Sequence, residues 1–180
     1  MRRLGLKVEE TVVNPWDDTP ELMALNPLGQ VPALKTPEGV ALFDSQAILE
    51  YLHDSTGRIW PADLNERIRV RQASVAAAGL IQASVAYYQE TSMHEPPTAL
   101  WVKDHFENAD RLLRNLLQSP NSLWIKDGSL TQAGWDLAVA DEYLALRMPE
   151  VTFHRDHALI RAILMIAAQN PDFVETRPKA

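Results

Sequence analysis

The chain contains no cysteine among its 180 residues. A disulfide bond, a cysteine nucleophile and a cysteine-ligated zinc site are therefore excluded. Basic residues are also scarce, because 17 Lys and Arg stand against 24 Asp and Glu and give a formal net charge of −7. This balance argues against a sequence-independent nucleic-acid binder, which needs a basic face. The net charge does not exclude the binding of small charged substrates, since a local basic pocket can lie inside an acidic protein.

Long apolar runs are missing too. The most apolar run, Ala73–Tyr88, is interrupted by Gln82 and Ser84 and is shorter than the roughly 20 residues that cross a bilayer. No signal peptide is visible in Met1–Val13, so we expect a cytoplasmic protein without a membrane partner. The apolar content of 46 % is enough for a sizeable core in one ordinary domain or two small ones.

Local signals in the first third predict the last turn of a helix, a strand, a short helix, an antiparallel hairpin and a longer helix. These elements are expected at Met1–Leu4, Lys7–Val13, Thr19–Leu25, Val31–Phe43 and Asp44–Asp54. The strand is predicted from β-branched residues, and the short helix from Thr19 as N-cap with proline after it. Pro37 and Gly39 fit the second and fourth positions of a type I turn in the hairpin.

The second part of the chain is helical in pattern. Apolar residues recur at helical spacing in four segments. These segments are Asn65–Thr91, Pro97–Gln118, Thr131–Arg147 and His157–Ala168, with a loop containing Pro120 and Gly128 between the second and the third. With a linker near Ser55–Pro61, the sequence predicts an α/β domain at residues 1–54 and an all-helical domain at residues 62–180.

Three stretches in this order carry a family resemblance: "NPLGQVPAL", "LFDSQAILEYL" and "LTQAGWDLAVADEYLALRMPE". The chain resembles the cytosolic glutathione transferases, and most of all the small bacterial members, over nearly its whole length. The resemblance implies a thioredoxin-like N-terminal domain, a glutathione transferase-type helical domain and a homodimer. In "LTQAG", Thr131 keeps the expected helix N-cap, whereas Gly134 stands where the family pattern has Asp.

The resemblance also implies a glutathione-binding site. It implies a cis peptide bond between Val31 and Pro32, with the backbone of Val31 pairing with the cysteinyl backbone of glutathione. From the residues alone, a trans proline in an ordinary turn is the alternative, because only about 5–6 % of such bonds are cis.

Asp44 and Ser45 would hold the γ-glutamyl end of glutathione at a helix N-terminus. From the pair alone, a plain N-cap is the alternative. Gln30 and Lys35 are further candidates for binding the tripeptide, although Lys35 is equally well explained as a solvated charge.

The chain departs from the family at its beginning. It lacks the usual first strand and most of the first helix, so the thioredoxin-like domain is expected to be N-terminally truncated. That segment carries the Tyr, Ser or Cys that stabilises the glutathione thiolate, and the catalytic residue is therefore unknown. Three explanations stay open: an internal start in a longer protein, direct pairing of the remaining strands, or a strand supplied by a partner chain.

The expected function is transfer of the glutathione thiolate, with glutathione as co-substrate, to a small electrophilic apolar substrate. For the chain as printed we expect weak glutathione binding and very low turnover. The alternative is a non-catalytic binding or assembly module. Tyr87, Tyr88 and Trp101 are candidates for an apolar substrate pocket or for the core. His154 and His157 lack a ligand pattern, so no metal is expected.

Overall fold

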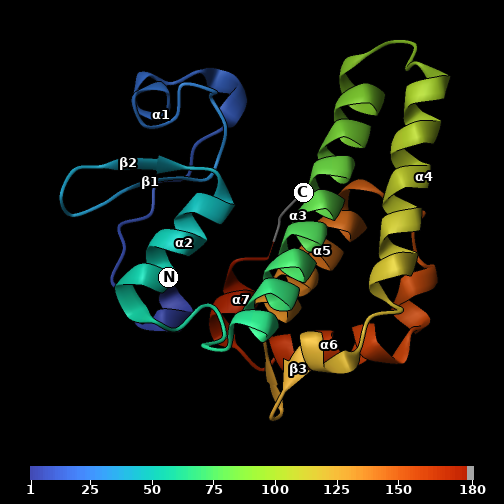
Figure 1. Ribbon diagram of the computed structural model, residues 1–180. Coiled ribbons are helices and arrows are strands. Elements are labelled where there is room, and N and C mark those ends of the chain that lie inside the picture. Colours follow the sequence, from blue (N-terminus) through green and yellow to red (C-terminus); the bar gives the residue numbers. More distant parts are fainter. Residues whose placement is uncertain (178–180) are drawn as a thin grey trace. The chain divides into compact units, whose positions relative to one another are not determined.

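The computed structural model describes residues 1–177 and divides into two compact units, Met1–Trp60 and the chain from Pro61 onward. The first unit mixes short helices with one small sheet (Figure 1). Its elements are the 3₁₀ helices η1 (Arg2–Leu4) and η2 (Pro15–Asp17), the helices α1 (Pro20–Leu25) and α2 (Ser45–Thr56), and the strands β1 (Ala33–Lys35) and β2 (Ala41–Phe43). The order confirms the predicted short helix, hairpin and longer helix.

The predicted strand at Lys7–Val13 is wrong. These residues form no ladder, and the sheet of the first unit has only two strands within residues 1–177. β-branched composition gives a tendency that becomes a strand only when a neighbour supplies hydrogen bonds and packing. The end of a helix predicted at Met1–Leu4 is found as the 3₁₀ turn η1, and Gly5 ends it in the left-handed region at φ 74°.

The hairpin follows the turn that the sequence predicts. β1 and β2 are antiparallel with Ala33 opposite Phe43 and Lys35 opposite Ala41. The N–H of Gly39 donates to the carbonyl of Thr36 at 2.9 Å, and Gly39 has φ 86°. That positive φ requires glycine at the fourth turn position, which explains why the chain reverses here.

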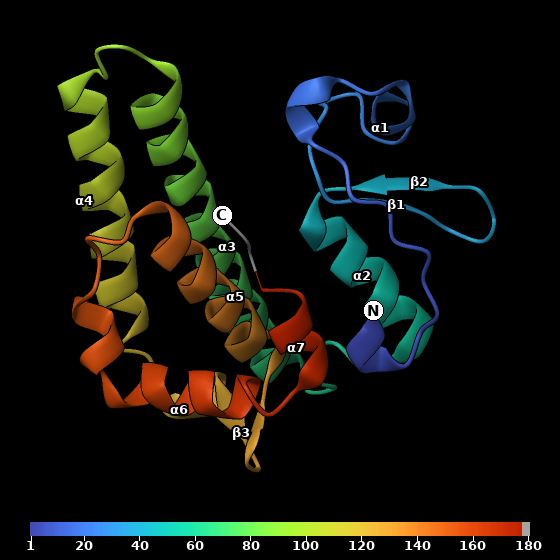
Figure 2. The same cartoon turned by 180° about the vertical axis from the view of Figure 1, so that it is seen from behind.

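The second unit is helical (Figure 2). Its helices are α3 (Leu64–Met93), α4 (Ala99–Leu116), α5 (Gln132–Arg147), α6 (Ala158–Ala167) and α7 (Pro171–Glu175), with the 3₁₀ helices η3 (Asn121–Leu123) and η4 (Phe153–Asp156). The four long helices confirm the predicted ones, whereas α7 lies beyond the Asn170–Pro171 stop and was missed. Within the described residues, no helix has the length and apolar character needed to span a bilayer.

Helix α5 packs between α3 and α6 and carries much of the core. In both views α3, α4 and α5 run side by side while α6 crosses their ends (Figures 1 and 2). Small buried residues on the facing surfaces, including Ala73 and Ala77 of α3 and Ala133 of α5, let the backbones approach. Ser74 of α3 donates to Asp136 Oδ2 of α5 at 2.5 Å, which ties the two helices together.

The packing at the start of α5 explains why Gly134 stands where the family pattern has Asp. Thr131 Oγ1 accepts from the N–H of Gly134 at 3.2 Å, which confirms the predicted N-cap. A Cβ on Gly134 would overlap the carbonyl oxygen of Trp124 and come within 3.3 Å of Leu130. Trp124 is fully buried, so its backbone has little freedom to withdraw. A side chain at position 134, where the family pattern has Asp, does not fit this packing, so the start of α5 keeps the Thr131 cap alone.

A small hairpin precedes α5 where only a loop was predicted. Strands β3 (Ile125–Lys126) and β4 (Ser129–Leu130) pair antiparallel. Asp127 and Gly128 between them have φ 51° and 74°. Asp-Gly at the centre of a two-residue turn is a strong hairpin signal, and it was the signal that could have found these strands.

Three asparagines are each followed by proline, and their side chains cap a helix or hold a loop. Asn14 Oδ1 accepts from the N–H of Trp16 at 3.2 Å before η2, and Asn170 Oδ1 accepts from that of Phe173 at 3.3 Å before α7. The third is Asn26, which ends α1. In each case the side-chain oxygen accepts an N–H that the backbone leaves unpaired.

Candidate functional site

The register of the hairpin gathers four predicted site residues at one end of the sheet. Val31 and Pro32 come just before Ala33, and Asp44 and Ser45 come just after Phe43. Because Ala33 lies opposite Phe43 in the antiparallel ladder, both pairs lie at the same end of the hairpin. Figure 1 shows β2 leading directly into α2 at the end where β1 begins.

The peptide bond between Val31 and Pro32 is cis, as predicted. Val31 is 49 % exposed. Among residues 1–177, neither its N–H nor its carbonyl has a hydrogen-bond partner. The main chain therefore offers one donor and one acceptor at the surface, which is what an extended peptide needs to pair as an added strand.

The N-terminus of α2 begins at a residue with unusual backbone geometry. Asp44 has φ 67° and ψ 130°, and its Oδ1 accepts from the N–H of Gln46 at 2.7 Å. A positive φ at a residue other than glycine costs free energy and is often retained at binding sites. Asp44 is thus the N-cap, as the plain alternative required.

Ser45 occupies the first position of α2. Its side chain is exposed, and within the described residues neither its hydroxyl nor its N–H is hydrogen bonded. With the partial positive charge of a helix N-terminus, these donors suit a carboxylate. One carboxyl group of the chain, that of Asp44, already caps the helix at Gln46, and Ser45 remains open to a ligand.

Asn26 shapes the loop that leads to Val31, and sequence reasoning missed it. Its side chain is buried, its Oδ1 accepts from the N–H of Leu28 at 3.0 Å, and its Nδ2 donates to the carbonyl of Gln30 at 2.7 Å. Gly29 turns the chain at φ 65°, and a side chain there would meet Asp18 Oδ1 at 3.3 Å. The two prolines, the glycine and this asparagine together fix the approach to Val31.

The remaining predicted residues lie less centrally. Gln30 is exposed, and its backbone carbonyl is occupied by Asn26. Lys35 is exposed at the far end of β1, opposite Ala41 and next to the turn. The structure therefore brings Val31, Pro32, Asp44 and Ser45 together, and it places Lys35 toward the other end of the hairpin.

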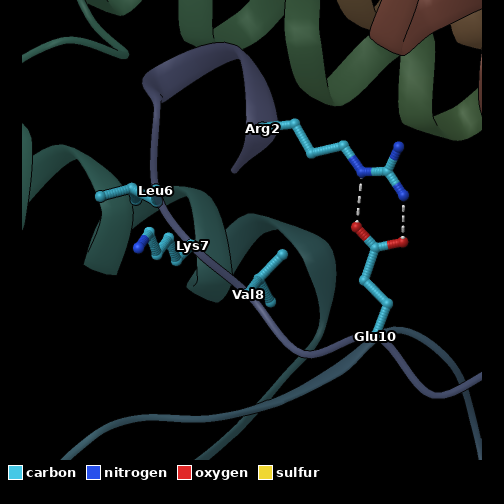
Figure 3. A pocket seen from close by; sticks show the side chains of 5 residues that line it. All are labelled: Arg2, Leu6, Lys7, Val8 and Glu10. Carbon is cyan, nitrogen blue, oxygen red and sulfur yellow. Dashed lines mark hydrogen bonds and ion pairs between the residues drawn. The ribbon is translucent and has the colours of Figure 1, made fainter.

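A separate surface depression in the first unit contains none of the predicted residues. It is lined by Arg2, Leu6, Lys7, Val8 and Glu10 (Figure 3). Arg2 and Glu10 point toward one another and form a bidentate pair at 2.7 and 2.8 Å. The hydrogen bond from Arg2 lowers the pKa of Glu10. Both charges are thus engaged with each other, and we assign no function to this depression.

Three histidines of the second unit have polar partners. His154 is buried with Nε2 at 2.5 Å from Asp141 Oδ1, while His157 Nδ1 accepts from the N–H of Leu159 at the start of α6. His94 Nδ1 lies 2.6 Å from Glu90 Oε2. A backbone hydrogen bond from Thr98 and the contact with His94 lower the pKa of Glu90. No group of three His, Cys, Asp or Glu suited to a metal ion occurs within the described residues.

Comparison with known proteins assigns the arrangement to a family. The family model described as glutathione S-transferase, N-terminal domain, matches residues 1–55. A crystal structure of a glutathione S-transferase from Methylobacillus flagellatus KT with glutathione (GSH) bound is 25 % identical, with a TM-score of 0.87. The match covers 99 % of this chain and 90 % of that chain. The N-terminal domain belongs to the glutathione S-transferase family. The fold of the chain is a thioredoxin-like domain with few strands followed by a helical domain.

Curated glutathione S-transferase relatives of the chain support the same assignment at low identity. The GST-like protein YibF of Escherichia coli K12 is 31 % identical over 118 residues, 64 % of this chain and 54 % of YibF. Glutathione S-transferase 1 of Dianthus caryophyllus is 29 % identical over 133 residues, 71 % of this chain and 57 % of that protein. Maleylacetoacetate isomerases of mouse and rat also match, at 32 % and 33 % identity. The chain thus spans about half the length of the curated relatives it matches.

Proposed function

We propose that the first unit binds glutathione and that the protein transfers its thiolate to small electrophilic apolar substrates. Val31 would pair through its backbone with the cysteinyl residue of glutathione. Ser45 would donate its hydroxyl and N–H to the γ-glutamyl carboxylate, and Asp44 would attract the ammonium group. Pro32, Gln30 and Lys35 would complete the surroundings of the tripeptide.

The unpaired backbone of Val31 beside the open N-terminus of α2 carries this proposal. A peptide with a free carboxylate near an extended main chain matches these two features, which lie at the same end of the hairpin. Glutathione bound in the crystal structure of the relative from Methylobacillus flagellatus supports the choice of ligand.

The chemistry requires the thiol to lose its proton. With an electrophile such as an aryl halide, the thiolate forms a carbon–sulfur bond, the halide leaves with the electrons of the broken bond, and the thiol proton goes to solvent. A free thiol has a pKa of about 8.5, so only a small fraction ionises at neutral pH without assistance. Since the chain has no cysteine, it has no thiol that could replace that of glutathione in this reaction.

Calorimetric titration with glutathione tests the binding step. Ser45→Ala should weaken binding about tenfold or more, because a hydrogen bond to a charged group contributes about 1.5–3 kcal/mol. Ser55→Ala is the matched control on the same helix, since its hydroxyl donates to the carbonyl of Tyr51 at 2.7 Å. Equal affinity of the two variants would reduce Asp44 and Ser45 to a helix cap.

Turnover of an aryl halide separates the enzyme from the alternative function. Measurable conjugation by the wild-type protein would support a transferase. Glutathione binding without turnover would favour a non-catalytic binding module. No binding of glutathione at millimolar concentration would remove the proposal.

We also propose that the protein is a homodimer in solution. Light scattering across tens of micromolar, where a weak association already shows, measures this directly. A monomer over that whole range would contradict it.

A further inference from the structure

Arg147, the last residue of α5, lies against the aromatic rings of two tyrosines. Its guanidinium carbon is 3.9 Å from the ring centroid of Tyr88 on α3 and 5.7 Å from that of Tyr143, one turn earlier on α5. All three side chains are partly buried. A guanidinium that stacks on a ring keeps its N–H groups in its own plane, where they can bind a planar anion.

The donors of Arg147 are unused within the chain. Among residues 1–177, Arg147 makes no hydrogen bond and no ion pair, and its Nε is sealed from solvent without an acceptor. Arg114, also in the second unit, differs from Arg147. Arg114 is exposed and donates to both carboxylate oxygens of Asp110, at 2.8 and 3.1 Å. The two Nη groups of Arg147 also lack an acceptor within the described residues but are not sealed, so they are the donors that a ligand can reach.

The carboxylate of Glu150, close to Arg147 in the sequence, has another partner. Glu150 follows Arg147 by three residues, and its carboxylate accepts a hydrogen bond from the Tyr87 hydroxyl. Arg147 itself is favoured by the negative end of α5 and by the two ring faces. These contacts hold the guanidinium in place but satisfy none of its five donors.

We propose that Arg147, with Tyr88 and Tyr143, binds the carboxylate of a small organic acid that has a flat apolar body. A carboxylate fits two parallel N–H donors of one guanidinium. The tyrosine rings would cover the flat body of the acid. A more highly charged anion is disfavoured by the net charge of −7 and by Glu150 in the same segment. This site lies wholly in the second unit and is independent of the proposed glutathione binding.

Titration with benzoate, followed in ¹⁵N-labelled protein through the Nε–H resonance of Arg147, tests the site. The resonance is assigned as the one lost in Arg147→Gln. We expect saturable shifts with a dissociation constant of about 1 mM, which is reasonable for a ligand of this size. Benzamide, which has the same shape without the charge, should bind at least tenfold more weakly at equal ionic strength.

Variants of Arg147 and Arg114 test whether the Arg147 guanidinium itself binds benzoate. Arg147→Gln should lower benzoate affinity tenfold or more, as read from the tyrosine resonances, and Arg114→Gln should leave it unchanged. Arg147→Lys keeps the charge but loses the planar fork, so it should bind with intermediate affinity, and it serves if the Gln variant does not fold. Equal binding of benzoate and benzamide, unchanged affinity in Arg147→Lys, or no shift at tens of millimolar benzoate would overturn the proposal.

Discussion

Asn26 uses both ends of its side-chain amide inside one loop, and this makes it sensitive to a very small change. Asn26→Asp keeps an acceptor for the N–H of Leu28 but replaces the donor to the carbonyl of Gln30 with an oxygen. We expect a loss of about 1–3 kcal/mol in the free energy of unfolding, because a buried acceptor loses its partner. Urea unfolding measures it, with Asn115→Asp on the exposed face of α4 as control. Equal stability of both variants would show that the amide does not hold the loop.

Gly134 is predicted to tolerate no side chain. Gly134→Ala would force the start of α5 away from the Trp124 carbonyl, and overpacking of this kind costs about 1–3 kcal/mol. Gly79→Ala makes the same chemical change in the middle of α3, where the nearest atom is a terminal methyl carbon of Leu112 at 3.3 Å. We therefore expect a clearly larger loss for Gly134 in thermal or urea unfolding. Similar losses would mean that Trp124 can move.

At the scale of elements, Tyr87 connects α3 to the segment after α5 through Glu150. The hydrogen bond to the Glu150 carboxylate raises the pKa of Tyr87 from 10.0 to about 12. The folded state therefore holds this proton more tightly than the unfolded chain. Its contribution to stability is complete below pH 10 and is lost as the pH rises toward about 12.

Absorbance titration of the phenolates checks this. One phenolate transition should appear near pH 12, and Glu150→Ala should move it to lower pH. Glu107→Ala, which removes an exposed carboxylate that lies 3.6 Å from Lys103, should leave the late step in place. A wild-type protein without a phenolate transition near pH 12 would contradict the assigned hydrogen bond.

Caps and turns were the most predictable elements, because their signals are local. Thr19, Asp44 and Thr131 each accept the hydrogen bond that an N-cap should accept. Packing was less predictable. Ile68 and Val75 have the spacing of a core face on α3, yet they are 54 % and 55 % exposed. A long helix has apolar residues on several faces, and only its neighbours decide which face is buried.

Some residues of the candidate site could likewise be predicted from the local sequence, and others could not. Val31, Pro32, Asp44 and Ser45 lie in two short motifs whose meaning is local, so their place at one end of the hairpin could be predicted. Asn26 acts through a side chain that reaches forward over four residues to the carbonyl of Gln30, and predicting this contact requires knowledge of the loop geometry. Arg147 and Tyr88 meet across two helices, and no spacing along the chain predicts that contact.

At the scale of the whole molecule, the two units should differ in stability. The first unit has a sheet of two three-residue strands, and six of the buried apolar side chains of the described core lie there. These are Leu4, Leu22, Ile48, Leu52, Ile59 and Trp60. A two-stranded sheet is marginal in water, and less buried apolar area gives less stability.

Hydrogen exchange measures this difference. Amides of α2 should exchange through openings of lower free energy than the central amides of α3 and α5. Peptide-resolved mass spectrometry on the wild-type protein is sufficient, because each unit provides its own long helix. Matching protection in α2 and α5 would show that the two units unfold together.

The three asparagines that precede proline have a consequence for how the protein ages. Spontaneous deamidation begins when the backbone nitrogen of the next residue attacks the side-chain amide, and that nitrogen must first give up its hydrogen. Proline has no hydrogen there. Asn14, Asn26 and Asn170 all hold backbone N–H groups through their side chains, and Pro15, Pro27 and Pro171 shield each of them from this reaction. The approach to Val31 is thereby built on an amide that is protected from this route of deamidation.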